Sequence, residues 1–214
     1  MSLVTINLAA GVYLDCVLFP LSFTELLDTI EKNGYVLNPT LPVNRALSRF
    51  RGSGQIGSKG KNTFQVDAGE KSIIIIGVSF EEVQSEFDAF SKTLLEDYSI
   101  DLDEMTKFYQ LSANCEYKTK YDPYEVISKM YESSPAEKAS ELLGLPVKTF
   151  SIRLASDALP RDIDWFDVKI TPHIERNDSY IIEIVYRNED KEKYQSFTKD
   201  YELKIINFIK HIEA

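Results

Sequence analysis

The sequence predicts an α+β fold in which two β-α-β-β-(β)-α halves form one curved antiparallel sheet, with long helices packed on one face. Three observations lead to this prediction. Apolar and other residues alternate over two long stretches, at the N-terminus and around residue 112, which indicates strands with one buried face. A helix-start signal follows each stretch. Further strand-like runs then lead to an amphipathic helix in both halves.

Length and composition restrict the class of protein. The chain has 214 residues, of which 43% are hydrophobic and 27% charged, as in globular proteins. We expect a first half at 1–99 and a second at 100–214, joined in one compact unit. Two cysteines exclude a disulfide framework and favour a reducing, cytoplasmic location. No apolar run reaches the roughly 20 residues of a membrane helix, so we expect no membrane partner.

The first half opens with a strand and a helix. Even positions across 4–18 are apolar, and this period of two predicts a strand with one buried face. Ser22 and Glu25 form a capping box that begins a helix, and Asn-Gly at 33–34 ends it. Segment 43–50 is ambiguous between a strand and a short helix.

Two further strands and a long helix complete this half. The strands are expected at 63–66 and 72–78, with a turn at 67–70. Ser79 and Glu82 form a second capping box. The helix that follows has its apolar residues at helical spacing, namely Phe80, Val83, Phe87, Phe90, Leu94 and Tyr98.

The second half repeats this order after a polar linker at 99–104. A strand is expected over 108–117, and two capped helices begin at Asp122 and Ser134. Three more strands are expected at 149–155, 166–174 and 180–186. One terminal helix places its apolar residues on one side, namely Phe197, Tyr201, Ile205, Phe208, Ile209 and Ile212.

This order resembles that of the TATA-box-binding protein family, with which the chain shares short segments. Thr5-Ile6-Asn7-Leu8 is similar to the family's first-strand Thr-Val-Asn-Leu, and residues 69–77 are similar to its turn, strand and glycine. The resemblance implies one curved sheet whose first strands meet at the centre. Cys16 and Cys115 each end a first strand, so it also implies that the two thiols are near neighbours.

The net charge of this chain differs from that of the family's DNA-binding domain. The net charge is −10, whereas the family's DNA-binding domain is basic, so the resemblance implies the fold more than the activity. Phe64 is a loose candidate for a DNA-kinking phenylalanine. A helix-grip protein, whose sheet and long helix enclose a ligand cavity, is a related alternative.

A basic segment interrupts this acidic chain. From 32 to 66 there are six cations and no carboxylate. The glycines at 52, 54 and 57 precede a strand rather than a helix, so they do not form a dinucleotide-binding loop. A flexible solvated loop, a phosphate or nucleic-acid contact and a protein contact all stay open. The candidate anion- or nucleic-acid-binding residues are Arg45, Arg49, Arg51, Lys59 and Lys61.

Other polar groups favour structural roles. The aspartates at 157–167 surround the only tryptophan, Trp165, and are typical of a turn between strands rather than a cation site. His173 is expected on a strand and His211 in the last helical turn, and neither has a second ligand at metal-binding spacing. The sequence has no catalytic motif, and we expect no cofactor or metal.

Polar residues on the outer face of both first strands complete the functional prediction. Asn7, Gln110 and Asn114 are the sheet-face candidates. We therefore expect a non-catalytic binding module that contacts a protein or anionic partner through the open sheet face and the basic segment. Two alternatives stay open: a nucleic-acid-binding protein, which the net charge disfavours, and a small-molecule-binding or enzymatic helix-grip protein. The sequence does not indicate the oligomeric state.

Overall fold

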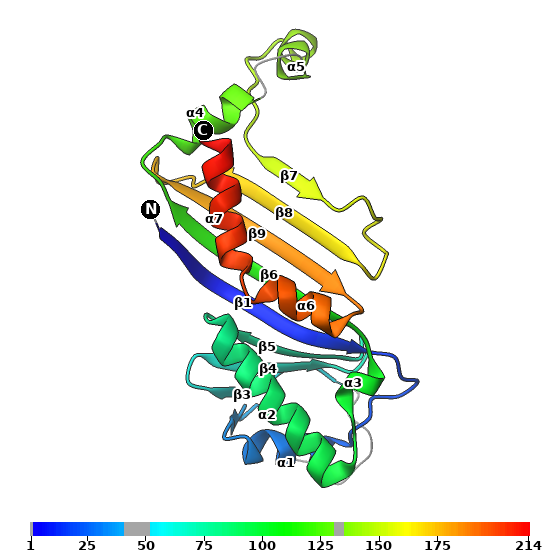
Figure 1. The fold of residues 1–214 in the computed structure, drawn as a ribbon. Coiled ribbons are helices and arrows are strands. Elements are labelled where there is room, and N and C mark those ends of the chain that lie inside the picture. Colours follow the sequence, from blue (N-terminus) through cyan, green and yellow to red (C-terminus); the bar gives the residue numbers. More distant parts are fainter. Residues whose placement is uncertain (1, 41–51, 131–134) are drawn as a thin grey trace.

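The computed structural model describes residues 2–40, 52–130 and 135–214 (Figure 1). The strands within these ranges are β1 Ser2–Leu14, β2 Val36–Leu37, β3 Ser53–Lys59, β4 Asn62–Asp67, β5 Ser72–Gly77, β6 Thr106–Lys118, β7 Ile152–Ala155, β8 Trp165–Pro172 and β9 Ser179–Asn188. The helices are α1 Phe23–Lys32, α2 Phe80–Tyr98, α3 Leu102–Met105, α4 Pro123–Met130, α5 Pro135–Leu143, α6 Lys191–Thr198 and α7 Tyr201–Ile212.

All the described strands belong to one antiparallel sheet, which confirms the α+β class. Their order is β2-β3-β4-β5-β1-β6-β9-β8-β7. The two longest strands, β1 and β6, pair at the centre, with Leu8 opposite Ala113 and Val12 opposite Tyr109. β5 follows on the far side of β1, and β9 on the far side of β6.

One face of the sheet packs against helices. Figure 1 shows α2, α6 and α7 lying against this same face. In β5, Ile73 and Ile75 are fully buried toward it, whereas the alternate residues Ile74 and Ile76 point to the opposite face and are half-buried. We call that opposite face, which carries Ile74 and Ile76, the uncovered face.

A bulge in β1 makes the alternation of buried and exposed residues differ from the prediction. The register with β6 shifts between Thr5 and Asn7, so one extra residue changes which side chains face the helices. After the bulge, even positions from Leu8 to Leu14 are buried, as predicted, but Val4 and Ile6 are 54% and 49% exposed. The strand also ends at Leu14, four residues before the predicted end of the pattern.

The glycine-rich segment is a strand rather than a solvated loop over 53–59. Ile56 is 1% exposed and anchors β3 to the core. A Cβ atom on Gly57 would lie 3.0 Å from the carbonyl oxygen of Val36, so the close pairing of β2 with β3 favours glycine there. The ambiguous segment 43–50 lies outside the described residues.

Two helical predictions also change. The expected linker contains α3, because Asp101 caps it by accepting a hydrogen bond from the N–H of Asp103 at 2.9 Å. The expected single terminal helix is two helices, α6 and α7. They separate at Asp200, which has non-helical backbone angles and precedes α7.

The cysteines lie at opposite ends of the central strands. β1 and β6 are antiparallel, so Cys115 lies opposite Thr5, whereas Cys16 follows Leu14, which lies opposite Thr106. The nine-residue separation along β6 corresponds to roughly 30 Å. The expectation that the thiols are near neighbours is therefore wrong.

No helix in the described ranges is long and apolar enough to cross a membrane.

Candidate functional site

The centre of the uncovered face carries a pair of asparagines. The β1 bulge places Asn7 opposite Asn114, and Nδ2 of Asn114 donates a hydrogen bond to Oδ1 of Asn7 at 2.9 Å. On the same strand as Asn114, Nε2 of Gln110 donates to Oγ of Ser112 at 3.3 Å. The sheet thus places the three predicted sheet-face residues on one surface, and each amide keeps further hydrogen-bonding capacity.

The half of this face formed by β1, β4 and β5 is largely uncharged. Ile74 lies opposite Gly11 and Ile76 opposite Ala9, and on the other side they pair with Gln65 and Thr63. These apolar and neutral polar side chains are half-buried. A mixture of this kind is suited to a protein interface, whereas a nucleic-acid backbone requires cations.

On the other half, formed by β6 to β9, ion pairs neutralise three of the cations. Nη2 of Arg153 lies 2.6 Å from Oδ2 of Asp167, and Nζ of Lys169 lies 2.8 Å from Oε1 of Glu183. Arg176 pairs with Glu116. Burial raises the pKa of Glu116, but the Ser179 hydrogen bond and the Arg176 charge outweigh it, so this pKa is lower than usual. These cations are therefore already engaged by carboxylates.

Arg187 differs from these cations. It forms no ion pair with any residue in the described part of the chain, and its Nε is buried without a hydrogen-bond acceptor. Its guanidinium carbon lies 5.3 Å from the ring centre of Phe108, within cation–π range. Phe108 in turn stacks on Tyr13, with ring centres 4.5 Å apart. We call Tyr13, Phe108 and Arg187 the Arg187 cluster.

A pocket of about 380 Å³ adjoins the Arg187 cluster. Gln110 lines it beside the cluster. The end of β1 and the β4–β5 turn contribute two carboxylates, Asp15 and Glu70, and one cation, Lys71. Lys107 from β6 and Arg187 from β9 add two further cations. Burial raises the pKa of Tyr13, and the nearby charge of Arg187 opposes that shift. The pocket therefore combines an aromatic wall with a guanidinium that forms no ion pair within the described ranges.

Sequence reasoning missed the Arg187 cluster. Phe108 begins the predicted strand 108–117 on the same face as Gln110, and Arg187 lies one residue beyond the expected end of 180–186. The register joins them, because Arg187 lies opposite Gln110, two positions from Phe108. The sequence signal that could have indicated this cluster was an aromatic residue, Phe108, at a strand position that faces away from the core.

The basic segment is only partly described. Arg45, Arg49 and Arg51 lie outside the described residues. Lys59 points toward the helices, where its Nζ lies 2.8 Å from Oε1 of Glu86 and 5.8 Å from the Tyr35 ring centre. Lys61, in the β3–β4 turn, is exposed and forms no ion pair within the described residues. Of the two described lysines, only Lys61 is therefore available to an anion without breaking an ion pair.

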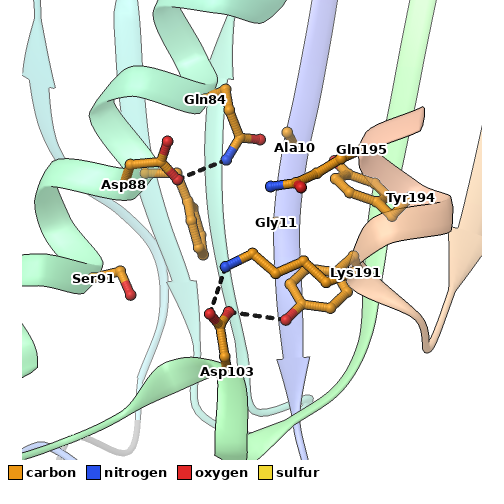
Figure 2. Close-up of a pocket in the computed structure, with 11 residues that line it drawn as sticks. Ala10, Gly11, Gln84, Asp88, Ser91, Asp103, Lys191, Tyr194 and Gln195 are labelled. Carbon is orange, nitrogen blue, oxygen red and sulfur yellow. Dashed lines mark hydrogen bonds and ion pairs between the residues drawn. The ribbon is translucent and has the colours of Figure 1, made fainter. Parts of the chain in front are cut away.

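The helix-covered side contains a second polar cluster (Figure 2). Asp103 of α3 accepts a hydrogen bond from the Tyr109 hydroxyl at 2.9 Å and pairs with Lys191 of α6. Burial and this hydrogen bond raise the pKa of Tyr109. The cavity beside them, which Gln84 and Gln195 also line, has a volume of about 20 Å³, enough for about one water molecule. Its size does not favour the helix-grip ligand alternative.

Other predicted polar residues make local contacts. His173 follows the end of β8 in a turn, not on a strand as expected, and its Nδ1 accepts from the N–H of Glu175 at 3.1 Å. Asp162 accepts from the N–H of Leu159, and Asp164 from that of Glu189. Among the described residues, no group of three or more His, Cys, Asp or Glu side chains could hold a metal ion.

Phe64 does not belong to the uncovered face. Its side chain is fully buried and packs against Phe90 of α2, with ring centres 4.7 Å apart. It cannot insert between base pairs, so its selection as a loose DNA-kinking candidate is wrong.

No known family profile matches the sequence, and no curated protein matches it.

Proposed function

We propose that this protein is a non-catalytic binding module whose uncovered face contacts a protein partner. The observation that carries the proposal is the combination of helices on one face of a nine-stranded sheet with half-buried apolar side chains on the other. Ile74 and Ile76 lie on that other face, together with Val4 and Ile6, which are 54% and 49% exposed. Apolar side chains grouped on an exposed surface favour protein–protein contact.

We further propose that residues 1–99 and 100–214 are duplicated halves of one binding unit. The strand order supports this, since β5 and β4 follow β1 outward on one side, while β9 and β8 follow β6 outward on the other. Asn7 and Asn114 lie at the junction of the two halves. Such a duplication would give the partner one continuous surface across both. The resemblance to the TATA-box-binding protein family, in fold and in DNA binding, stays a prediction.

Charge favours a protein over nucleic acid as the partner. Arg153, Lys169 and Arg176 on the β6–β9 side are ion-paired, so phosphate binding at these three cations would have to break their ion pairs. The chain as a whole carries a net charge of −10, which repels a polyanion. Nucleic-acid binding through the basic segment is the alternative that the experiment below must separate.

Site-specific photo-crosslinking tests the proposal. A photoreactive residue replaces Ser112 on the uncovered face, and in a matched control it replaces Lys92, whose side chain is 73% exposed on α2. The proposal predicts a discrete protein adduct from position 112 that is absent from position 92. Adducts equally abundant from both positions, or an adduct with nucleic acid in place of protein, would contradict it.

A further inference from the structure

Arg187 forms no ion pair within the described part of the chain and has a buried polar atom without a hydrogen-bond partner there. Arg153 and Arg176, in contrast, are bound to carboxylates, Arg153 through Nε and Nη2 to Asp167 and Arg176 to Glu116. The buried atom of Arg187 is Nε. An unmade hydrogen bond at a buried donor is costly, and more so when the donor is charged. A ligand oxygen at this position would remove that cost.

The orientation of Arg187 is fixed before any ligand arrives. Its guanidinium lies over Phe108, which is itself stacked on Tyr13. In the adjacent strand β8, Trp165 lies opposite Arg187 and is only 9% exposed. Flat packing of this kind restricts an arginine side chain and reduces the ordering cost of binding.

Space for a ligand lies beside Gln110. This residue lies opposite Arg187, and its side chain lines a pocket together with Tyr13, Phe108 and Arg187. The pocket of about 380 Å³ at this end of the face accommodates a side chain of a partner.

The two carboxylates of the pocket lie on one side of it. Asp15 and Glu70 belong to the end of β1 and the turn before β5, whereas Arg187 belongs to β9, with β6 between them. Lys71 and Lys107 also line the pocket and form no ion pair within the described residues. Cations therefore outnumber carboxylates, and the guanidinium is the one furthest from the acidic side.

We propose that the Arg187 cluster anchors a carboxylate from an acidic segment of the protein partner, with an apolar or aromatic side chain of that segment packed on Tyr13 and Phe108. Arginine binds a planar carboxylate through two parallel hydrogen bonds, and the aromatic stack supplies apolar contact beside it. Cations confined to one pocket fit a short acidic segment better than a phosphodiester backbone, which is contacted along its length. This inference rests on the proposed protein-binding function and specifies the partner's chemistry.

The test measures binding of a fluorescein-labelled peptide, in which Asp and Glu alternate with Phe, to the full chain by fluorescence anisotropy. The uncharged control peptide has Asn and Gln in place of the acids. The inference predicts that the acidic peptide alone binds and that Arg187→Gln weakens it at least about tenfold. Arg187→Lys, which keeps the charge but loses the planar fork, should restore only part of the affinity.

Arg153→Gln is the matched variant, because it removes an arginine of the same face that is already paired with Asp167. It should leave peptide affinity unchanged, and far-UV circular dichroism with thermal unfolding should show that all three variants are folded. Equal affinity of wild type and Arg187→Gln, or equal loss in Arg153→Gln, would overturn the inference. So would a single-stranded oligonucleotide that binds more tightly than the peptide and depends on Arg187.

The result is distinguishable from failure of the proposed function. A protein adduct from position 112 together with no Arg187-dependent peptide binding would refute the acidic-segment inference and leave the binding face in place. Absence of the protein adduct and of Arg187-dependent peptide binding would refute the proposed function as well as the acidic-segment inference.

Discussion

Asn114 donates a hydrogen bond to Asn7 at 2.9 Å across the central pair of strands, and both side chains are exposed. Because water competes for this hydrogen bond, Asn114→Ala should change the free energy of unfolding by no more than about 1 kcal/mol. Affinity for a partner docked on the face should nevertheless fall. Urea unfolding and binding measured on the same variant separate the two effects. A loss of several kcal/mol without a change in affinity would make the pair structural.

The close contact of Gly11 with β5 predicts a specific loss of stability. A Cβ atom there would lie 2.4 Å from the carbonyl oxygen of Ile73, so Gly11→Ala must displace β5 and should cost about 1–3 kcal/mol. Gly69→Ala is the control, since its Cβ would meet only a side-chain oxygen of Asp67 at 3.2 Å. Chemical denaturation measures both. Equal stability of the two variants would show that β1 and β5 are not so closely paired.

Buried tyrosines predict loss of stability at alkaline pH. Burial is the main cause of a raised pKa at several tyrosines, the most strongly affected being Tyr35, Tyr109, Tyr180, Tyr194 and Tyr201. Unfolded tyrosine ionises near pH 10, so these groups stabilise the fold fully below about pH 10, and each loses up to about 1.4 kcal/mol per pH unit above it.

Absorbance at 295 nm, followed against pH, measures this effect. The native protein should show delayed ionisation for part of its 12 tyrosines, completed together with loss of circular dichroism. The guanidinium-unfolded chain is the control, and all of its tyrosines should titrate near pH 10. Full ionisation near that pH with the fold intact would contradict the burial.

The two thiols should react at very different rates. Cys115 is fully buried, and burial raises its pKa to about 11, so almost no accessible thiolate forms near pH 8. Cys16 is half-buried and should react first with a disulfide reagent. Cys16→Ser should therefore remove the fast phase. Rapid modification of both thiols in the native protein, located by mass spectrometry, would place Cys115 at the surface.

Local sequence patterns predicted most of the fold but little of the binding face. The run Ile73–Ile76 and the alternation around Leu111 predicted strands because period and β-branching are local properties. The bulge before Asn7 changed the direction of Val4 and Ile6, since register depends on the neighbouring strand. α3 was missed because its apolar anchor, Leu102, stands among acidic residues.

The Arg187 cluster required information that no local pattern contains. Tyr13, Phe108 and Arg187 come from three strands far apart in the sequence, and only the sheet order brings them together. The Asn7–Asn114 pair was found in part, because both residues stood at polar positions of strands expected to meet. Their hydrogen bond depended on the bulge. Predicting which residues lie on a face thus proved easier than predicting which of them touch.

The most direct test of the protein-binding face compares two matched substitutions. Ile6, 49% exposed on the uncovered face, and Leu203, 56% exposed on α7, are each changed to Lys. Both variants should retain wild-type stability within about 0.5 kcal/mol, since each site is at the surface. Isothermal titration with the partner captured from position 112 then measures affinity. The account predicts that Ile6→Lys weakens binding at least about tenfold and that Leu203→Lys does not, whereas the reverse order would place the interface on the helices.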